Sequence, residues 1–359
     1  MLLVTDRRAL HRIPELERHL PKTMEYLTDS LKKRKCTVFS PMESSVCAFF
    51  DFGKPDTVAF RADCDALPIT EQTDHDFPSC YPGAMHACGH DGHMAILLEL
   101  ARRLDEKQDL PHNVLLVFQP GEESPGGAHD LCETGIFTKY NVKAIFGLHL
   151  WPGLAKGVVH SRANELMSRS SEINVDIYGK SAHIGRSWEG KDALAAAMEF
   201  YRKVTAMEQA MPENVYRLLK FGHFESGSVR NAISAHSRLE GSLRAFQDEV
   251  FDGMVASIRA IAAEVEASTG CRVEINMSTG YPAILNPETL CALVPPYQEL
   301  AEPSMTSEDF SWYQRYVPGM FFFLGLGDTP ALHSANFDFD ESVLTAGVDY
   351  FEKLAEEFP

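Results

Sequence analysis

The amino-acid sequence predicts an α/β fold in which a main domain with a mixed sheet carries a smaller inserted α+β domain. In the first part of the chain, short apolar runs alternate with helical periodicity, which is typical of buried strands connected by helices. The middle part has the order β-α-β-β-α-β, which is that of a ferredoxin-like unit. The length of 359 residues also favours two domains, because single hydrophobic cores rarely exceed about 250–300 residues.

Four apolar runs are expected to form buried strands of the main domain. They cover residues 57–60 (TVAF), 113–118 (NVLLVF), 143–150 (KAIFGLHL) and 319–326 (GMFFFLGL). Between the first two runs, residues 93–104 place apolar side chains at i, i+3, i+4 and i+7, which is the period of an amphipathic helix. Strands and helix in this alternation predict a mostly buried sheet covered by helices.

The inserted domain is expected at residues 169–279, between two parts of the main domain at 1–168 and 280–359. Such insertions are tolerated in exposed loops. Its predicted elements are, in chain order, a strand at 172–178, a helix at 191–209, strands at 216–224 and 236–246, a helix at 249–267 and a strand at 272–278.

Composition and charge argue against several classes of function. The chain has 33 basic and 51 acidic residues, and its formal net charge of -18 repels phosphate backbones and anionic membrane surfaces. No stretch approaches the roughly 18 apolar residues of a membrane span, and the first residues reach charge too early for a signal peptide. The eight cysteines are scattered, which favours free thiols. We expect a cytoplasmic enzyme with no nucleic-acid or membrane partner.

Candidate ligands follow each of the four apolar runs. In open α/β sheets, sites form beyond the carboxyl ends of the strands, so these side chains are expected to converge. Taken alone, each has a plainer explanation, such as a turn residue, a solvated acidic loop or a hydrogen-bonded core histidine. The candidates are, in chain order, Asp63, Asp65, Glu122, Glu123, His149 and His333.

The densest cluster is HACGHDGH, at residues 86–93, directly before the amphipathic helix. A histidine-rich helix cap or a closed structural zinc site would also give such density, but structural zinc sites close with four Cys or His ligands. A further alternative makes Cys88 a nucleophile with His90 or His93 as its base. The two-residue spacing of Cys88 and His90 suits metal coordination better.

The neighbouring carboxylates Glu122 and Glu123 are the second strong signal. On an irregular turn, two adjacent side chains can face different ways, so that one binds a metal while the other moves protons. Two like charges at this distance also raise one pKa towards neutrality unless cations lie beside them, and either outcome suits a general base.

These motifs resemble the aminoacylase and amidohydrolase branch of the two-metal metallopeptidases, which includes hippurate hydrolases, auxin-conjugate hydrolases and N-acetyldiaminopimelate deacetylases. The resemblance covers nearly the whole chain. It implies a catalytic domain of the two-metal exopeptidase type with an inserted ferredoxin-like lid and dimerisation domain. The motifs are, in order, RRALHRIPEL, RADCDALPITE, MHACGHDGHMA, VFQPGEES, FGLHLWP, GKSAH, EGSLRAF, MTSEDF and LHSANF.

The resemblance also implies roles for the candidate residues. Glu122 would be the general base, and Asp63 would be an acid that orients a metal ligand. The cofactor would be two divalent ions, of zinc, manganese, cobalt or nickel. Their ligands would be Cys88, shared between the ions, with His90, Glu123, His149 and His333.

In the inserted domain, the resemblance implies that His183 reaches an active site, often that of a partner subunit, and stabilises the oxyanion. A homodimer is therefore expected. Asn231 and Arg244 match positions that contact the substrate carboxylate or support the oxyanion site, although Asn231 alone could cap a turn and Arg244 could be a solvated strand residue. Arg230 could pair a second carboxylate, or be an exposed arginine without such a role.

The expected reaction is removal of the acyl group from an N-acyl amino acid. The segments SVRNAIS, PSMTSEDF, PGMFFFLG and LHSANF look closest to N-acetyldiaminopimelate deacetylases. The alternatives are a broader aminoacylase or hippurate hydrolase, a dipeptidase, and a catalytically silent metal-binding protein on the same fold. Two departures from the family pattern are Ser187, where a proline is usual, and a shortened segment at 290–305.

Overall fold

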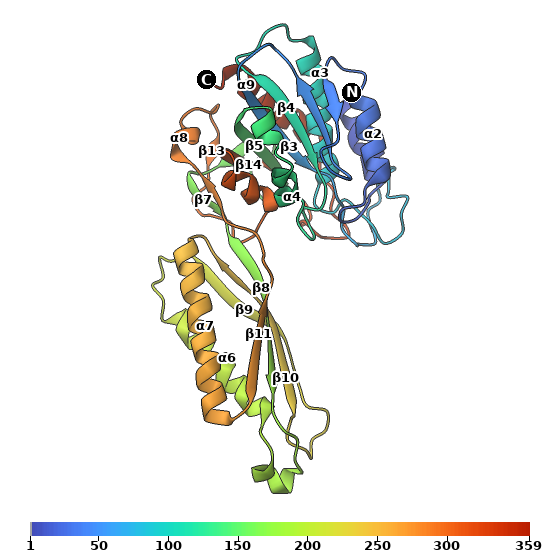
Figure 1. The fold of residues 1–359 in the computed structure, drawn as a ribbon. Coiled ribbons are helices and arrows are strands. Elements are labelled where there is room, and N and C mark those ends of the chain that lie inside the picture. Colours follow the sequence, from blue (N-terminus) through green and yellow to red (C-terminus); the bar gives the residue numbers. More distant parts are fainter. Residues whose placement is uncertain (1) are drawn as a thin grey trace. The chain divides into compact units, whose positions relative to one another are not determined.

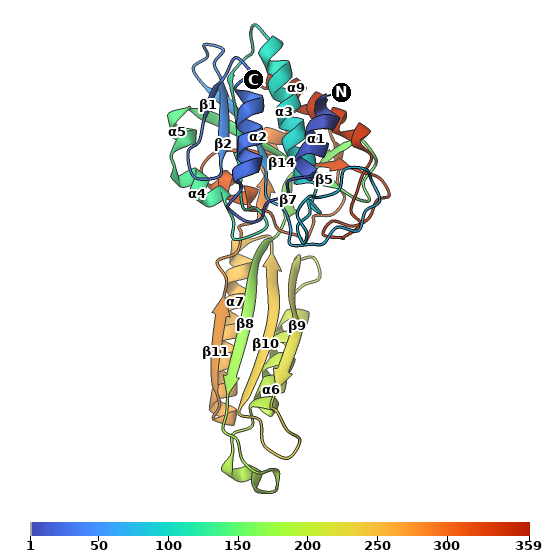
Figure 2. The same cartoon turned by 90° about the vertical axis from the view of Figure 1, so that its right-hand side faces the viewer.

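The computed structural model describes residues 2–359, which form two compact units (Figures 1 and 2). The first unit holds the chain up to Leu166 together with Leu285–Glu302 and Glu308–Pro359. The second unit holds Met167–Ile284 and a short returning segment, Pro303–Ser307. The predicted mixed α/β fold class is confirmed.

The first unit is built on an eight-stranded mixed sheet with the order β1-β2-β4-β3-β5-β14-β6-β13. Strands β4, β3, β5 and β14 run parallel to their neighbours within this group, and β2 extends it by antiparallel pairing to β4. The bounds are β1 Thr37–Phe39, β2 Val46–Phe50, β3 Thr57–Asp63, β4 Asn113–Gln119, β5 Val142–Trp151, β6 Val159–Ser161, β13 Gln298–Glu299 and β14 Gly319–Gly325. The four parallel strands are the four predicted apolar runs.

The helices of the first unit pack against its sheet. Every residue of β3, β4 and β14 is consequently buried, which explains why these strands are continuously apolar in sequence. The helices are α1 Leu2–His11, α2 Pro21–Leu31, α3 His90–Glu106, α4 Ala128–Glu133, α5 Ile136–Lys139, α8 Glu288–Cys291 and α9 Leu344–Glu357.

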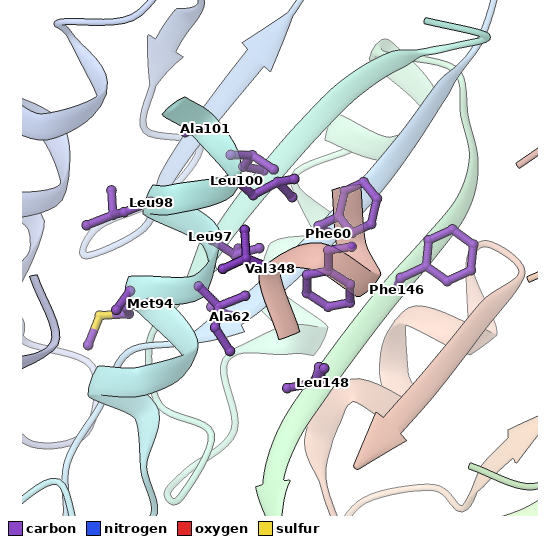
Figure 3. Close-up of a cluster of buried hydrophobic side chains, with 14 of the residues drawn as sticks. Phe60, Ala62, Met94, Leu97, Leu98, Leu100, Ala101, Phe146, Leu148 and Val348 are labelled. Atoms are coloured by element: carbon purple, nitrogen blue, oxygen red, sulfur yellow. The ribbon is translucent and has the colours of Figure 1, made fainter. Parts of the chain in front are cut away.

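The core of the first unit includes a cluster of aliphatic and aromatic side chains from α3, α9 and the sheet (Figure 3). Leu97 of α3 and Val348 of α9 are fully buried there with Phe60 of β3. Burying each such side chain stabilises the fold by about 1.5–3 kcal/mol. This packing holds the middle of α3 against β3 and α9.

The second unit is an antiparallel sheet with the order β11-β8-β10-β9, packed against two helices. Along β8, Ile173, Val175 and Ile177 are fully buried at alternate positions, as expected for a strand with one face on a core. This is the predicted ferredoxin-like order. The bounds are β8 Arg169–Tyr178, α6 Ala193–Gln209, β9 Arg217–Ser226, β10 His236–Ala245, α7 Asp248–Thr269 and β11 Arg272–Met277, while the connecting strands are β7 Asn164–Met167 and β12 Ile284–Asn286.

Two further expectations concern the whole chain. All eight cysteines are free thiols, as predicted. Among the helices of residues 2–359, none combines the length and the apolar character that crossing a bilayer requires.

Candidate metal centre

The five predicted ligands converge beyond the carboxyl ends of the parallel strands. Cys88 precedes α3 and His90 begins it, while His149 is near the end of β5. Glu123 follows β4, and His333 follows β14. The Sγ atom of Cys88 lies 3.4 Å from Nε2 of His149 and 3.3 Å from Nε2 of His333. Side chains that are up to 245 positions apart in the sequence are thus in contact.

Cys88 belongs to two groups of possible ligands. One group is Cys88, His90 and His149, and the other is Cys88, Glu123 and His333; within each, the ligand atoms all lie within 4.8 Å of one another. Oε1 of Glu123 is 3.2 Å from Nε2 of His333 and 3.9 Å from Nε2 of His90. Cys88 is thus common to two groups of candidate ligands, which is compatible with the shared role that the resemblance implies for it.

Backbone carbonyl groups orient two of the imidazoles. Nδ1 of His90 lies 2.8 Å from the carbonyl oxygen of Asp65, and Nδ1 of His149 lies 2.7 Å from that of Leu150. A carbonyl oxygen only accepts hydrogen bonds, so both Nδ1 atoms carry the proton and both Nε2 atoms keep a lone pair. Burial lowers the pKa of His90 and of His149, which keeps these rings in the neutral form that a metal requires.

The fit of a metal can be tested at His90. This side chain is 1% exposed, and within the described chain its Nε2 atom has no hydrogen-bond partner. Leaving a buried polar nitrogen unsatisfied costs about 1–3 kcal/mol. Soft thiolate, imidazole and carboxylate donors surround this atom, and that donor set suits zinc and other divalent transition ions. The residues therefore fit the implied ions.

The alternative in which Cys88 is a nucleophile with His93 as base does not match the geometry. Nδ1 of His93 donates to Oδ1 of Asp63 at 2.6 Å, and Nε2 of His93 accepts from the backbone N–H of Leu150 at 2.9 Å. Both ring nitrogens are thus occupied. Burial and the nearby carboxylates of Glu123 and Glu122 raise the pKa of Cys88, so the thiolate needs a cation beside it.

Asp65 holds the turn that carries the two neighbouring carboxylates. Its two side-chain oxygens accept the backbone N–H groups of Glu122 and Glu123, each at 2.9 Å. Glu123 thereby faces His333, whereas Glu122 is buried, and its pKa is raised by burial and by the carboxylates of Glu308 and Glu123. The sequence singled out Asp65 as a strand-end carboxylate but gave no sign of this role.

The structure places Asp63 beside His93. We predicted that Asp63 orients a metal ligand; its hydrogen bonds go to His93 and to Nη1 of Arg61, both at 2.6 Å, and its Oδ2 atom is 3.8 Å from Nε2 of His90. Because His93 also binds the N–H of Leu150, Asp63 acts on the strand end next to His149 through the His93 ring.

Sequence reasoning missed the buried cation that joins the strand ends. Arg61 of β3 is 1% exposed and binds Asp63, Glu308 and Asp309, the last two at 2.8 Å. Asp309 in turn accepts hydrogen bonds from Gln119 at the end of β4 and from Gly127 and Ala128 beyond it. The MTSEDF motif was the available signal, but nothing in its composition indicates that its carboxylates meet an arginine 247 positions away.

Four residues of the second unit were predicted to take part in the site, and the structure brings the segments of two of them, His183 and Asn231, together. The backbone N–H of Ile184, next to His183, donates to the carbonyl oxygen of Asn231 at 3.0 Å. Nη1 of Arg244 donates to the carbonyl oxygen of Met305 at 2.6 Å within the same unit. Arg230 is exposed in the loop that carries Asn231. Their functional roles stay predictions.

Comparison with known proteins gives consistent results. Residues 59–357 match peptidase family M20/M25/M40. The chain is 34% identical over 370 residues to an uncharacterized hydrolase of Staphylococcus epidermidis, with 98% of this chain and 97% of the relative covered. A relative from Staphylococcus haemolyticus, also an uncharacterized hydrolase, is 34% identical, with 97% and 96% covered.

Solved structures agree over the full length. A dinuclear metal binding peptidase of the M20 family from Bacillus subtilis is 30% identical, with a TM-score of 0.86 and with 99% of this chain and 96% of that chain covered. A candidate aminohydrolase from methicillin-resistant Staphylococcus aureus is 28% identical, with a TM-score of 0.91 and with 98% and 95% covered. From its sequence match, the chain belongs to peptidase family M20/M25/M40 and is a hydrolase of that family.

Proposed function

We propose that this hydrolase removes the acyl group from an N-acyl amino acid by means of two divalent ions. The observation that carries the proposal is the position of Cys88, whose Sγ atom is common to both groups of ligand atoms. The proposed ligands are Cys88, His90, Glu123, His149 and His333. When bound, such ions lower the pKa of a water molecule and polarise the amide carbonyl.

The residues of the chain then have separate tasks. Glu122 takes a proton from the attacking water and returns it to the leaving amine; burial and the nearby carboxylates raise its pKa, which makes it a stronger base, and cations beside it would keep it ionised. Asp65 fixes the turn that carries Glu122 and the proposed ligand Glu123, so that the two carboxylates point in different directions. Asp63 and His93 hold the end of β5 beside His149.

The thiol ligand supports a proposal for the metal and for the location. A thiolate favours zinc among divalent ions, whereas imidazole and carboxylate ligands also admit manganese, cobalt or nickel. A thiol persists without oxidation in a reducing compartment, and all eight cysteines are free. We therefore propose zinc as the first ion to test and the cytoplasm as the location.

For the substrate, we propose an N-acetylated dicarboxylic amino acid such as N-acetyldiaminopimelate. The support is an exposed arginine, Arg230, in the same loop as Asn231, because guanidinium groups bind carboxylates in a bidentate manner. A dipeptidase is the second candidate, favoured by the 30% identity to an M20-family peptidase. Rates on acetyl, benzoyl and dipeptide substrates decide between them, and a preference for dipeptides would contradict the acylase proposal.

We also propose that two copies of the chain associate through the second unit. Strand β9 lies at the edge of its sheet, and its Phe224 is 46% exposed. Beside it, Met198 and Tyr201 of α6 are 61% and 48% exposed and line a cavity with Phe224. A second copy would cover this apolar surface by extending the sheet, and its His183 would serve the first copy's site.

The association is tested by mass measurement in solution. Replacing Met198 and Tyr201 with glutamate should convert a dimer to a monomer in sedimentation equilibrium. Leu2→Glu, at a side chain that is 58% exposed in the first unit, is the matched control and should remain dimeric. A wild-type chain that sediments as a monomer would contradict the proposal.

A further inference from the structure

A second cluster of ligating side chains lies in the first unit, outside the groups around Cys88. It consists of His11, Glu71 and His75, whose ligand atoms all lie within 4.8 Å of one another. Oε1 of Glu71 is 3.3 Å from Nε2 of His11 and 3.0 Å from Nε2 of His75. Zinc bonds of about 2.0–2.2 Å place tetrahedral ligand atoms roughly 3.3–3.6 Å apart, so this spacing is close to that of a metal site.

The three side chains are withdrawn from water. The side chain of His11 is 1% exposed, that of Glu71 is 7% exposed and that of His75 is 9% exposed. They come from the end of α1 and from the segment that precedes Cys88, so they join two distant parts of the chain. A solvated acidic loop would not bury its histidines in this way.

An outer carboxylate orients the first imidazole. Nδ1 of His11 lies 2.8 Å from Oδ2 of Asp91, and the same oxygen binds Nε of Arg7 at 3.0 Å. A carboxylate on one ring nitrogen, with the other nitrogen directed at further ligands, is the usual arrangement of a metal-binding histidine.

Buried imidazole nitrogens without a hydrogen-bond partner occur near the cluster. Within the part of the chain that the structure describes, Nδ1 of His75 and both ring nitrogens of His86 are buried without a hydrogen-bond partner. His86 is 1% exposed, and its ring centroid is 6.4 Å from that of His11. Nε2 of His75, which faces Glu71, instead lies 3.1 Å from Oγ1 of Thr73, so the unpaired nitrogens are not the ligand atoms of the cluster.

We propose that His11, Glu71 and His75 bind one divalent transition-metal ion, of which zinc is the representative. Two imidazoles and a carboxylate are a donor set that zinc accepts. The ion would fasten α1 and the segment before Cys88 to Asp91, which follows the proposed ligand His90 in the chain. The competing occupant is a proton on His11, held between the carboxylates of Asp91 and Glu71.

The test counts the zinc ions bound per full-length chain, by equilibrium dialysis and elemental analysis. Wild type should bind one more ion than either variant, His75→Leu or Glu71→Gln. Glu71→Gln is included because it is nearly isosteric and so disturbs the fold least. The control His19→Leu, at a side chain that is 78% exposed, should bind as many ions as wild type. Because only differences are read, the result is independent of the number of ions at Cys88. Equal counts in wild type and both variants would overturn the proposal.

Discussion

Oδ2 of Asp65 accepts the backbone N–H of Glu123 at 2.9 Å, and Oδ1 of Asp65 accepts the backbone N–H of Glu122 at the same distance. A single side chain at the end of β3 thus fixes the turn after β4. Asp65→Asn keeps the shape but replaces one acceptor with a donor. We expect kcat to fall by about 10–100-fold, as is typical when a residue that supports a metal ligand is lost. Steady-state kinetics measure kcat, and an unchanged value would show that the turn keeps its conformation without the carboxylate of Asp65.

The His93 ring is predicted to position His149. In His93→Gln, the contacts with Asp63 and with the N–H of Leu150 are lost or lengthened, so zinc affinity should decrease by about 10–100-fold. Competition with a chromophoric chelator measures the affinity. His160→Gln is the control and should leave zinc binding unchanged, because the ring of His160 on β6 has, within residues 2–359, only the carbonyl oxygen of Val158 as a hydrogen-bond partner. If both variants bind zinc as wild type does, His93 has no positioning role.

Removing the charge of Arg61 should destabilise the first unit. Arg61→Met leaves the carboxylates of Asp63, Glu308 and Asp309 without their shared cation in a buried place, and breaking a buried ion pair on one side costs about 3–5 kcal/mol. A lower Tm in scanning calorimetry is the expected result. Arg61→Lys keeps the charge but loses the planar geometry of the guanidinium group. Its Tm should therefore lie between that of wild type and that of Arg61→Met. A Tm equal to that of wild type in the methionine variant would contradict this account.

Gly89 is predicted to be irreplaceable between Cys88 and His90. Its φ is +85°, and a Cβ atom there would lie 3.1 Å from Cδ1 of Leu150. A left-handed conformation costs a residue with a Cβ atom about 1–2 kcal/mol, so Gly89→Ala should move both ligands. We expect weaker zinc binding in calorimetric titration. Gly53→Ala, which has a φ of +70° but open space around its Cβ position, is the matched control.

The sequence predicted the parts of the fold that depend on local pattern. The four central strands are continuous apolar runs because both faces of the sheet are covered, and the alternation of Ile173, Val175 and Ile177 marks a strand with one buried face. The short strands β1, β6 and β13 were missed because they have only two or three residues each, too few for a pattern.

The candidate site was predictable where residue type and strand position coincide, as for Glu123 after β4 and His149 near the end of β5. The supporting contacts were not, because they depend on the tertiary structure. Arg61 follows an apolar run like many strand-end residues, and its partner Glu308 lies 247 positions away. Likewise, His93 was as good a ligand candidate in sequence as His90, and only its two hydrogen bonds show that its nitrogens are occupied.

The central claim is that Cys88 is shared by two ions. An anomalous difference map of a zinc-loaded crystal, recorded at the zinc absorption edge, tests it most directly. The account predicts two peaks about 3.5–4 Å apart, on either side of the Sγ atom of Cys88. A map with no peak there, or with one peak that Cys88 does not contact, would contradict it.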